Sequence, residues 1–319
     1  MVLGENFGGV WRETHLFCSA FIVGSGNYGG ANLCLALMSQ KIMPAIWCQN
    51  NAGEAAQFYA EVFQEARIVE HKPGLATTVD IHGLQFLLIN GGDMFAPNPS
   101  ISGLLNFDPL LFGGEEGARA YLDKVYEQLC VEELRPLDEY PFSKRYAWIR
   151  DKYGVTWQLM LTDPEGEPRP FVVPSFMFGQ VNHFKAEAAS DKWISLFDDS
   201  RRGTLIHYQD DAEGIDAGSV MFTDFQLCGE YFAAMDAGEY HEFTFTPGVS
   251  ILVFCKDQEE IDRLWNALSA VPEAESCGWC QDEYGISWQI VPENIFSLMA
   301  NEQSREKILS MKKIQLDQL

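Results

Sequence analysis

Alternating apolar and polar residues occur in paired runs along the chain, and these runs predict β-hairpins. Residues 79–86 (VDIHGLQF) and 225–232 (FQLCGEYF) each carry two such runs around a glycine. A period of two places successive side chains on opposite faces of a strand, and glycine permits a tight turn. Each stretch is therefore expected to form two antiparallel strands that meet at Gly83 or Gly229.

Apolar residues at spacings of three and four predict helices that pack on these strands. Asp257 and Glu260 have the spacing of a capping box and indicate where the last of these helices begins. The apolar faces of three helices consist of Ala55, Tyr59, Val62 and Phe63; of Ala118, Leu122, Val125 and Leu129; and of Ile261, Leu264, Trp265 and Leu268.

Two stretches of the chain are near copies of each other. Residues 146–161 (YAWIRDKYGVTWQLML) and 278–292 (GWCQDEYGISWQIVP) share a Tyr-Gly turn followed by a strand with Trp-Gln at its centre. Their separation is the size of a domain rather than of a short repeat. The sequence therefore predicts a duplicated module, in which the order β-α-β-β-β occurs twice.

The boundaries of the modules follow from these matches and from a connection rich in Pro and Gly around Thr162–Pro174. Residues 1–41 match neither module, and we interpret them as a mis-assigned start or as a disordered or packed extension. The expected organisation is an extension (1–41), module 1 (42–165), a linker (166–171), module 2 (172–292) and a C-terminal helix (293–319) that buries Ile295, Leu298, Met299, Ile308, Leu309 and Met311.

The chain resembles the vicinal-oxygen-chelate superfamily, which includes glyoxalase I, extradiol dioxygenases and bleomycin-resistance proteins. Within it, the similarity is greatest to the PhnB-like group, some of whose domains carry the label of a demethylubiquinone methyltransferase. The resemblance implies an α+β fold in which paired βαβββ units form a curved sheet around a cavity. It is carried by residues 90–99 (NGGDMFAPNP), 151–161 (DKYGVTWQLML), 243–250 (FTFTPGVS) and 282–292 (DEYGISWQIVP).

The resemblance also indicates where metal-using members place their ligands. A divalent metal needs several converging N or O ligands, commonly His and carboxylate. Each module here offers one amide and one hydroxyl, so we expect no metal cofactor, and a divalent metal remains the alternative. The ligand positions fall on Gln158 and Gln289, on Ser102 and Ser250, near Pro44 and Phe178, and around Phe86 and Phe232.

The same positions are the candidates for ligand binding, because an amide both donates and accepts hydrogen bonds. Gln158 and Gln289 have a second interpretation as solvated polar groups at the edge of a strand. Alternation directs Thr156 and Ser287 to the same side as the glutamines, and Trp157 and Trp288 to the helix layer. The candidate substrate-binding residues are Gln158, Gln289, Ser102, Ser250, Thr156, Ser287 and, at the cavity rim, His241; the sequence assigns no catalytic residue.

Composition limits the partners of the chain. The formal net charge of −24 over 319 residues disfavours binding to nucleic acid or to anionic lipid. No apolar run is long enough to span a membrane, and several of the eight cysteines lie in apolar strand patterns, as expected of buried thiols in a reducing cytoplasm. We therefore expect a cytoplasmic protein, either a monomer with its modules paired within the chain or a homodimer.

Three functions fit this sequence. The first is binding of a small organic ligand in the βαβββ cavities, with or without turnover and without a metal. The second is a divalent-metal lyase, isomerase or dioxygenase. The third is non-enzymatic sequestration of an antibiotic. A methyl transfer is discounted, because the chain has no glycine-rich loop in a βαβ context that suits S-adenosylmethionine.

Overall fold

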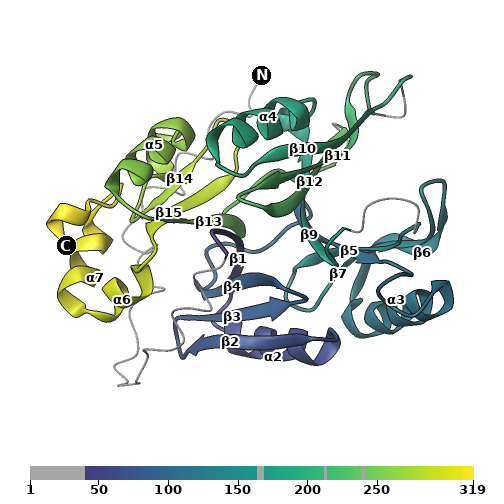
Figure 1. The fold of residues 1–319 in the computed structure, drawn as a ribbon, viewed down its shortest axis with the longest axis horizontal. Coiled ribbons are helices and arrows are strands. Elements are labelled where there is room, and N and C mark those ends of the chain that lie inside the picture. The colour runs from purple at the N-terminus through teal and green to yellow at the C-terminus, as the bar shows by residue number, and fades with distance from the viewer. Residues whose placement is uncertain (1–39, 164–168, 212–213, 239–240) are drawn as a thin grey trace.

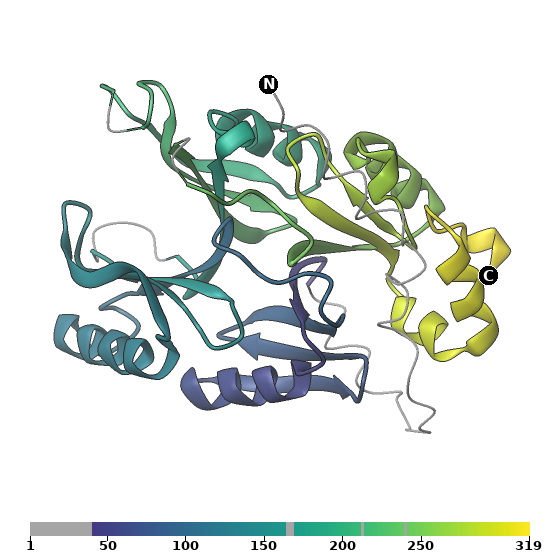
Figure 2. The same cartoon turned by 180° about the vertical axis from the view of Figure 1, so that it is seen from behind.

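The computed structural model describes residues 40–163, 169–211, 214–238 and 241–319. Two mixed β-sheets, A and B, lie at the centre of the molecule, and helices cover them on the outside (Figures 1 and 2). The predicted α+β class and the duplicated βαβββ units are confirmed. The predicted N-terminal extension lies outside the described residues, apart from its last two positions.

Module 1 contains two complete βαβββ units. Helices α2 and α3 bury the apolar faces that the sequence predicts, including Tyr59 and Leu122. The first unit comprises β1 (Ile42–Cys48), α2 (Ala52–Val62), β2 (Ala66–Lys72), β3 (Ala76–Ile81) and β4 (Leu84–Asn90); the second comprises β5 (Ile101–Phe107), α3 (Glu115–Leu129), β6 (Glu132–Tyr140), β7 (Ser143–Arg150) and β8 (Thr156–Leu161).

Module 2 repeats this order with one strand fewer. In the second unit of module 2, a short 3₁₀ turn that begins with Pro272 connects α5 to β14 and takes the place of a strand. The units comprise β9 (Val172–Gly179), η3 (Gln180–Asn182), α4 (Ala186–Leu196), β10 (Arg201–His207), β11 (Val220–Leu227) and β12 (Glu230–Gly238); then β13 (Val249–Cys255), α5 (Gln258–Leu268), η4 (Pro272–Ala274), β14 (Trp279–Gln281) and β15 (Ser287–Pro292).

The hairpins turn at the glycines that the sequence singled out. His82 and Gly83 join β3 to β4, and Cys228 and Gly229 join β11 to β12, all four with positive φ. Two successive residues with positive φ are typical of the type I′ turn, whose twist matches that of a hairpin. Glycine adopts this conformation without strain, which explains why both turns place it second.

Each sheet takes its strands from both modules. Sheet A has the order β14-β15-β13-β1-β4-β3-β2, and sheet B has the order β10-β11-β12-β9-β5-β8-β7-β6. The modules join by antiparallel pairing of β1 with β13, where Ala45 lies opposite Ser250, and of β5 with β9, where Ser102 lies opposite Ser175. The paired units that form one curved sheet are therefore a unit of module 1 and a unit of module 2.

Two of the hydrophobic cores belong mainly to one module each. One core joins α2 and α3 to the outer faces of the strands of module 1, and a second core is built mainly from α4, α5 and the strands of module 2. Trp157 and Trp288 lie in these cores, almost completely buried, as the alternation of their strands predicts. Each module thus has a core between its helices and strands, and a third cluster, which includes Met43 and Leu87 of module 1 and Leu252 of module 2, lies across the pairing of β1 with β13.

A buried aspartate holds each module together at the repeated motif. Asp151 accepts hydrogen bonds from the hydroxyl of Tyr59, the indole of Trp157 and two backbone N–H groups of its own loop. Asp282 accepts from two indoles, those of Trp193 and Trp288, and again from two backbone N–H groups. Burial raises the pKa of both carboxyl groups, that of Asp282 to about 6, although the N–H donors oppose this shift.

The C-terminal segment differs from the predicted single helix. It forms α6 (Ile295–Ala300), α7 (Glu302–Ser310) and the 3₁₀ turn η5 (Leu316–Gln318). The break falls at Asn301, whose side chain accepts a hydrogen bond from the backbone N–H of Ser304 and so begins a new helix. Of the residues expected to be buried, Ile295, Met299 and Ile308 are buried, whereas Leu298, Leu309 and Met311 are half-buried.

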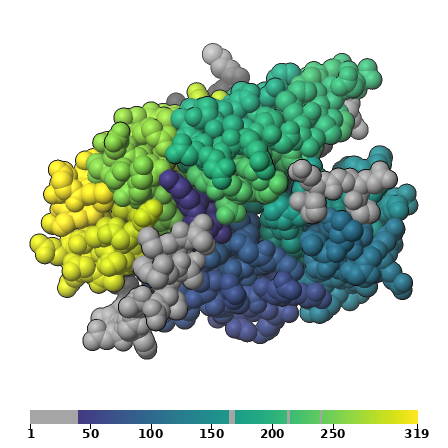
Figure 3. All heavy atoms as spheres, in the orientation of Figure 1, coloured from purple at the N-terminus to yellow at the C-terminus, as the bar shows by residue number. Residues whose placement is uncertain are grey.

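These short helices cover one sheet only. Ile295, Met299 and Ile308 pack against Leu252 and Trp279 on the face of sheet A that lies opposite α2 and α5. Figure 3 shows the segment, in yellow, at one end of the molecule. Within the described residues, no helix combines the length and the apolar character needed to cross a lipid bilayer.

The bond between Tyr59 and Asp151 generates a prediction. Tyr59→Phe removes a 2.8 Å hydrogen bond between two buried groups, so we expect the free energy of unfolding to fall by about 1–3 kcal/mol. Urea denaturation followed by tryptophan fluorescence measures this change. Tyr153→Phe is the matched control, because Tyr153 is only half-buried and bonds Asp151 through its backbone N–H alone. Equal losses in both variants would contradict this role for the Tyr59 hydroxyl.

Candidate functional site

The inner face of sheet B, opposite helices α3 and α4, carries a row of small hydroxyl groups. Thr156 lies opposite Ser102 across the β8–β5 pair, and Ser102 lies opposite Ser175 across the β5–β9 pair. Residues directly opposite each other share a face of the sheet. Gln158 belongs to the next row, opposite Trp148 on β7 and Leu104 on β5.

Some of these polar groups bond one another, but two do not. The hydroxyls of Ser102 and Thr156 are 2.8 Å apart, and the indole of Trp148 donates to Ser102 Oγ at 3.2 Å. The Gln158 Oε1 atom accepts a hydrogen bond from the hydroxyl of Tyr146 at 2.9 Å. Gln158 Nε2 and the hydroxyl of Ser175 are both buried and have no hydrogen-bond partner among the described residues.

On the equivalent face of sheet A the glutamine amide has a hydrogen-bond partner, and another part of the chain covers the face. Gln289 Nε2 donates to Ser250 Oγ at 2.9 Å, and Ser250 lies opposite Ala45, the counterpart of Ser175. The C-terminal segment packs over this face, as described above. Ser287 is the one sequence-predicted residue here whose hydroxyl has no partner among the described residues. The two inner faces are therefore not equivalent.

His241 lies at the edge of the inner face of sheet B. Its ring centroid is 6.0 Å from that of Trp148 and 4.9 Å from that of Phe243. Burial lowers the pKa of His241, and the nearby charge of Arg135 lowers it further. The structure thus brings His241 together with Gln158, Ser102 and Thr156 on one sheet, and places Gln289, Ser250 and Ser287 on the other.

Four of the positions that the sequence aligned with metal ligands carry no side chain that could bind a metal on an inner face. Phe86, Phe178 and Phe232 pack in the hydrophobic cores with the helices, and Pro44 has no donor side chain. On β9, Ser175 rather than Phe178 faces inward. Sequence reasoning missed Ser175; the alternation of Val173, Ser175 and Met177 was the signal that could have identified it.

A pocket of about 540 Å³ lies beside this face, between β10–β11 and the two ends of the connection between modules. Asn106 contributes to it, and it lies opposite Met160, two residues beyond Gln158 on the same face. The lining is mostly polar: Asn106, Asp108, Thr162, Asp163, Arg169, Arg201, Arg202, Gly203, Thr204, Asp224, Phe225, Gln226 and Tyr231.

Several groups in this pocket are fixed by strong contacts. Arg169 Nε bonds Asp224 Oδ2 at 2.5 Å, and the other oxygen of Asp224 accepts from the backbone N–H of Thr204. Asn106 Nδ2 donates to the carbonyl oxygen of Pro170 at 2.8 Å. Asn106 Oδ1 and the hydroxyl of Thr162 are buried and have no partner within the described chain.

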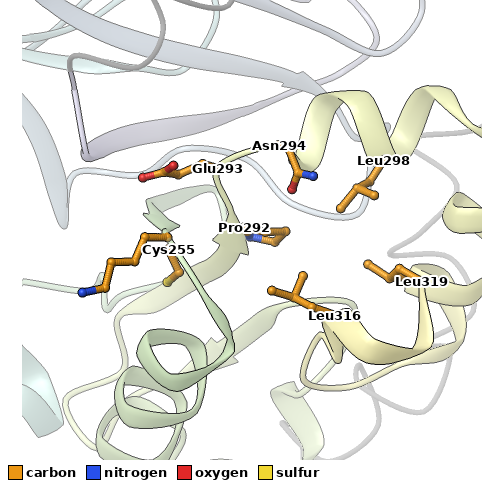
Figure 4. A pocket seen from close by; sticks show the side chains of 8 residues that line it. Cys255, Pro292, Glu293, Asn294, Leu298, Leu316 and Leu319 are labelled. Carbon is orange, nitrogen blue, oxygen red and sulfur yellow. The ribbon is translucent and has the colours of Figure 1, made fainter.

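A second pocket, of about 440 Å³, lies where the C-terminal segment meets the ends of β13 and β15 (Figure 4). Leu298, Leu316 and Leu319 point into it opposite Cys255 and Pro292. None of its lining residues is a sequence-predicted site residue, and none carries an unpartnered buried polar atom. The pocket beside sheet B is therefore the stronger candidate.

The residues of the inner faces do not fit a divalent metal. Across the residues that the structure describes, no group of three or more His, Cys, Asp or Glu side chains converges on one point. The oxygen groups near Gln158 are the hydroxyl of Tyr146, which bonds Gln158 Oε1, and in the neighbouring row those of Ser102 and Thr156, which bond each other; all three are uncharged hydroxyls. Such a set lacks the imidazoles and carboxylates that hold divalent ions in proteins.

The chain is similar to several proteins of solved structure. A PhnB protein from Bacillus cereus, described as a 3-demethylubiquinone-9 3-methyltransferase, is 31% identical over 39% of this chain and 100% of its own, with a TM-score of 0.33. A mutant form of glyoxalase I from Zea mays is 8% identical over 84% of this chain and 99% of its own, with a TM-score of 0.50. The second similarity concerns the fold alone.

A lactoylglutathione lyase from Agrobacterium tumefaciens is 18% identical over 39% of this chain and 93% of its own, with a TM-score of 0.26. No curated protein matches the chain. The model of the family described as 3-demethylubiquinone-9 3-methyltransferase matches residues 40–160 and, a second time, residues 171–291, together more than half of the chain. The chain therefore belongs to this family, within the vicinal-oxygen-chelate superfamily, and carries two copies of the family's module in tandem.

Proposed function

We propose that this protein binds a small organic ligand on the inner face of sheet B and in the adjoining pocket, without the help of a metal ion. The observation that carries the proposal is the pair of buried, unpartnered groups on that face, Gln158 Nε2 and Ser175 Oγ. A buried polar group without a hydrogen bond costs about 1–3 kcal/mol. Folded proteins rarely retain such groups, and those that remain are found preferentially at functional sites.

The contrast with sheet A supports the same conclusion. There the equivalent amide, that of Gln289, is satisfied by Ser250, and apolar side chains of the C-terminal segment cover the face. Ser287 Oγ and Gln85 Oε1 of sheet A also have no partner among the described residues, but the chain's own C-terminal segment already occupies that side of the sheet. We therefore assign the ligand to sheet B only.

Binding, rather than catalysis, is the activity that these groups support. Amides and hydroxyls recognise a ligand by hydrogen bonding, but they supply no proton with a pKa near neutrality. Methyl transfer, which the family's description names, fits poorly. Among the described residues that line the pocket there is one glycine, Gly203, and it lies within strand β10 and not in a turn that leads into a helix, where nucleotide-type cofactors are held.

A fragment screen tests the proposal. Neutral organic fragments are screened by saturation-transfer NMR against the wild type and against Gln158→Met and Gln289→Met, with circular dichroism to establish that each variant folds. We expect at least one fragment whose signal is lost in Gln158→Met and kept in Gln289→Met, because of these two amides only that of Gln158 has an Nε2 atom without a partner among the described residues. If every binding fragment persists in Gln158→Met, the ligand does not bind at this face.

Because the hydroxyl of Ser250 has a hydrogen-bond partner and that of Ser175 has none among the described residues, we also expect their removal to affect stability differently. Ser175→Ala removes an unpartnered buried hydroxyl, so the free energy of unfolding should rise by about 1 kcal/mol or stay unchanged. Ser250→Ala removes the acceptor of Gln289 and should lower it by about 1–3 kcal/mol. Urea denaturation of both variants measures the difference, and a substantial loss in Ser175→Ala would show that its hydroxyl is part of the folded core.

Metal content provides an independent prediction. A neutral amide does not offset the dehydration of a divalent ion as a carboxylate does, so protein purified without an affinity tag should contain well under one equivalent of Zn, Ni, Mn or Fe. Elemental analysis measures this. Stoichiometric metal that disappears in both Gln158→Ala and Gln289→Ala would refute the proposal and favour a divalent-metal lyase, isomerase or dioxygenase.

A further inference from the structure

We infer that the pocket beside sheet B takes a neutral, polyhydroxylated ligand, a sugar or a polyol. This inference rests on the proposed function, whose ligand class it specifies. The pocket lies beside the inner face: Asn106, in its lining, lies opposite Met160, two residues beyond Gln158 on the same strand. Its volume of about 540 Å³ lies within the range of small-molecule sites.

Asn106 sets the first requirement on the ligand. The side chain is 1% exposed, and its Nδ2 atom donates to the carbonyl oxygen of Pro170 at 2.8 Å. A carbonyl oxygen can only accept, so this bond fixes the orientation of the amide. Oδ1 is therefore the unpartnered atom in the pocket, and it accepts hydrogen bonds only. The ligand must bring a donor to it, which a fully ionised phosphate or carboxylate does not have.

The other open groups in the pocket favour a ligand that both donates and accepts. The hydroxyl of Thr162 is buried without a partner, and within the described chain no side-chain hydrogen bond engages Gln226 or Tyr231. Arg201 adds a guanidinium that only donates. Each hydroxyl of a polyol is both a donor and an acceptor, so an array of hydroxyls satisfies this mixture.

The charges of the lining do not favour an anion. Arg169 is paired with Asp224, and Arg202 with Asp191 outside the pocket. Among the described residues of the lining, three aspartates (Asp108, Asp163 and Asp224) balance the charge of three arginines. An anion would therefore gain little net attraction here, in a chain whose formal net charge is already −24.

Comparison of the sheets distinguishes Arg201, which forms no ion pair with any residue that the structure describes. Arg201 lies opposite Gln226 in the β10–β11 pair, as Arg67 lies opposite Asp80 in the β2–β3 pair of sheet A. Arg67 bonds Asp80 at 3.1 Å, whereas the amide opposite Arg201 carries no charge to hold it. Arg67→Gln is therefore a matched control for Arg201→Gln.

The experiment is saturation-transfer NMR on the full chain with glucose, ribose and myo-inositol as neutral probes, and inorganic phosphate and citrate as anionic competitors. At least one neutral probe should receive saturation from the protein, and neither anion should displace it. Asn106→Ala should lower the affinity for that probe by about tenfold, as expected for one lost hydrogen bond to a buried group. Arg201→Gln, at an exposed position that does not endanger folding, should also weaken it, while Arg67→Gln should not.

Three results would overturn the inference: no saturation of any neutral probe at millimolar concentration, displacement by phosphate or citrate, or equal binding in wild type, Asn106→Ala and Arg201→Gln. A fragment that depends on Gln158 while no polyol binds would leave the proposed function standing and refute the ligand class alone. The absence of both kinds of binding would refute both.

Discussion

The buried aspartate of each module is the interaction on which the rest of the structure depends. Asp151 connects helix α2, which packs on sheet A, to strand β8 of sheet B. It accepts hydrogen bonds from Tyr59 of the helix and from Trp157 of the strand. A carboxylate with four N–H or O–H donors can stay buried because its lone pairs are all used. The bond to Trp157 holds that side chain in the helix layer, so the next residue, Gln158, must face inward.

Much of this arrangement could be predicted from the sequence, because the strands and hairpins are specified locally. Alternation placed Trp157 in the core and Gln158 on the other face of the same strand, and the glycines marked the turns. The pairing of β1 with β13 could not be predicted, since no local pattern tells a strand edge which distant strand it will meet. Ser175 was missed because the position assigned on this strand, Phe178, is three residues away, and any odd displacement along a strand reverses the face.

The two sheets show how a duplicated module can divide its roles. The first-strand position is Ala45 in sheet A and Ser175 in sheet B, and this difference of one hydroxyl accompanies a face covered by the C-terminal segment and one on which Ser175 Oγ has no partner among the described residues. The C-terminal segment, which has no counterpart after module 1, packs on sheet A only. A sheet that supports a core in this way is under little pressure to keep polar groups available, whereas its partner can retain them at a cost in stability.

Joining the sheets across modules also has a consequence for how the protein is made. The chain leaves the ribosome from its N-terminus, so β1 and β5 are complete long before their partners β13 and β9 exist. Until then module 1 has its own core but displays two unpaired strand edges, which readily pair with strands of other chains. Synthesis therefore passes through a stage at which a nascent chain is vulnerable to its neighbours, and this stage ends only when β13 has emerged.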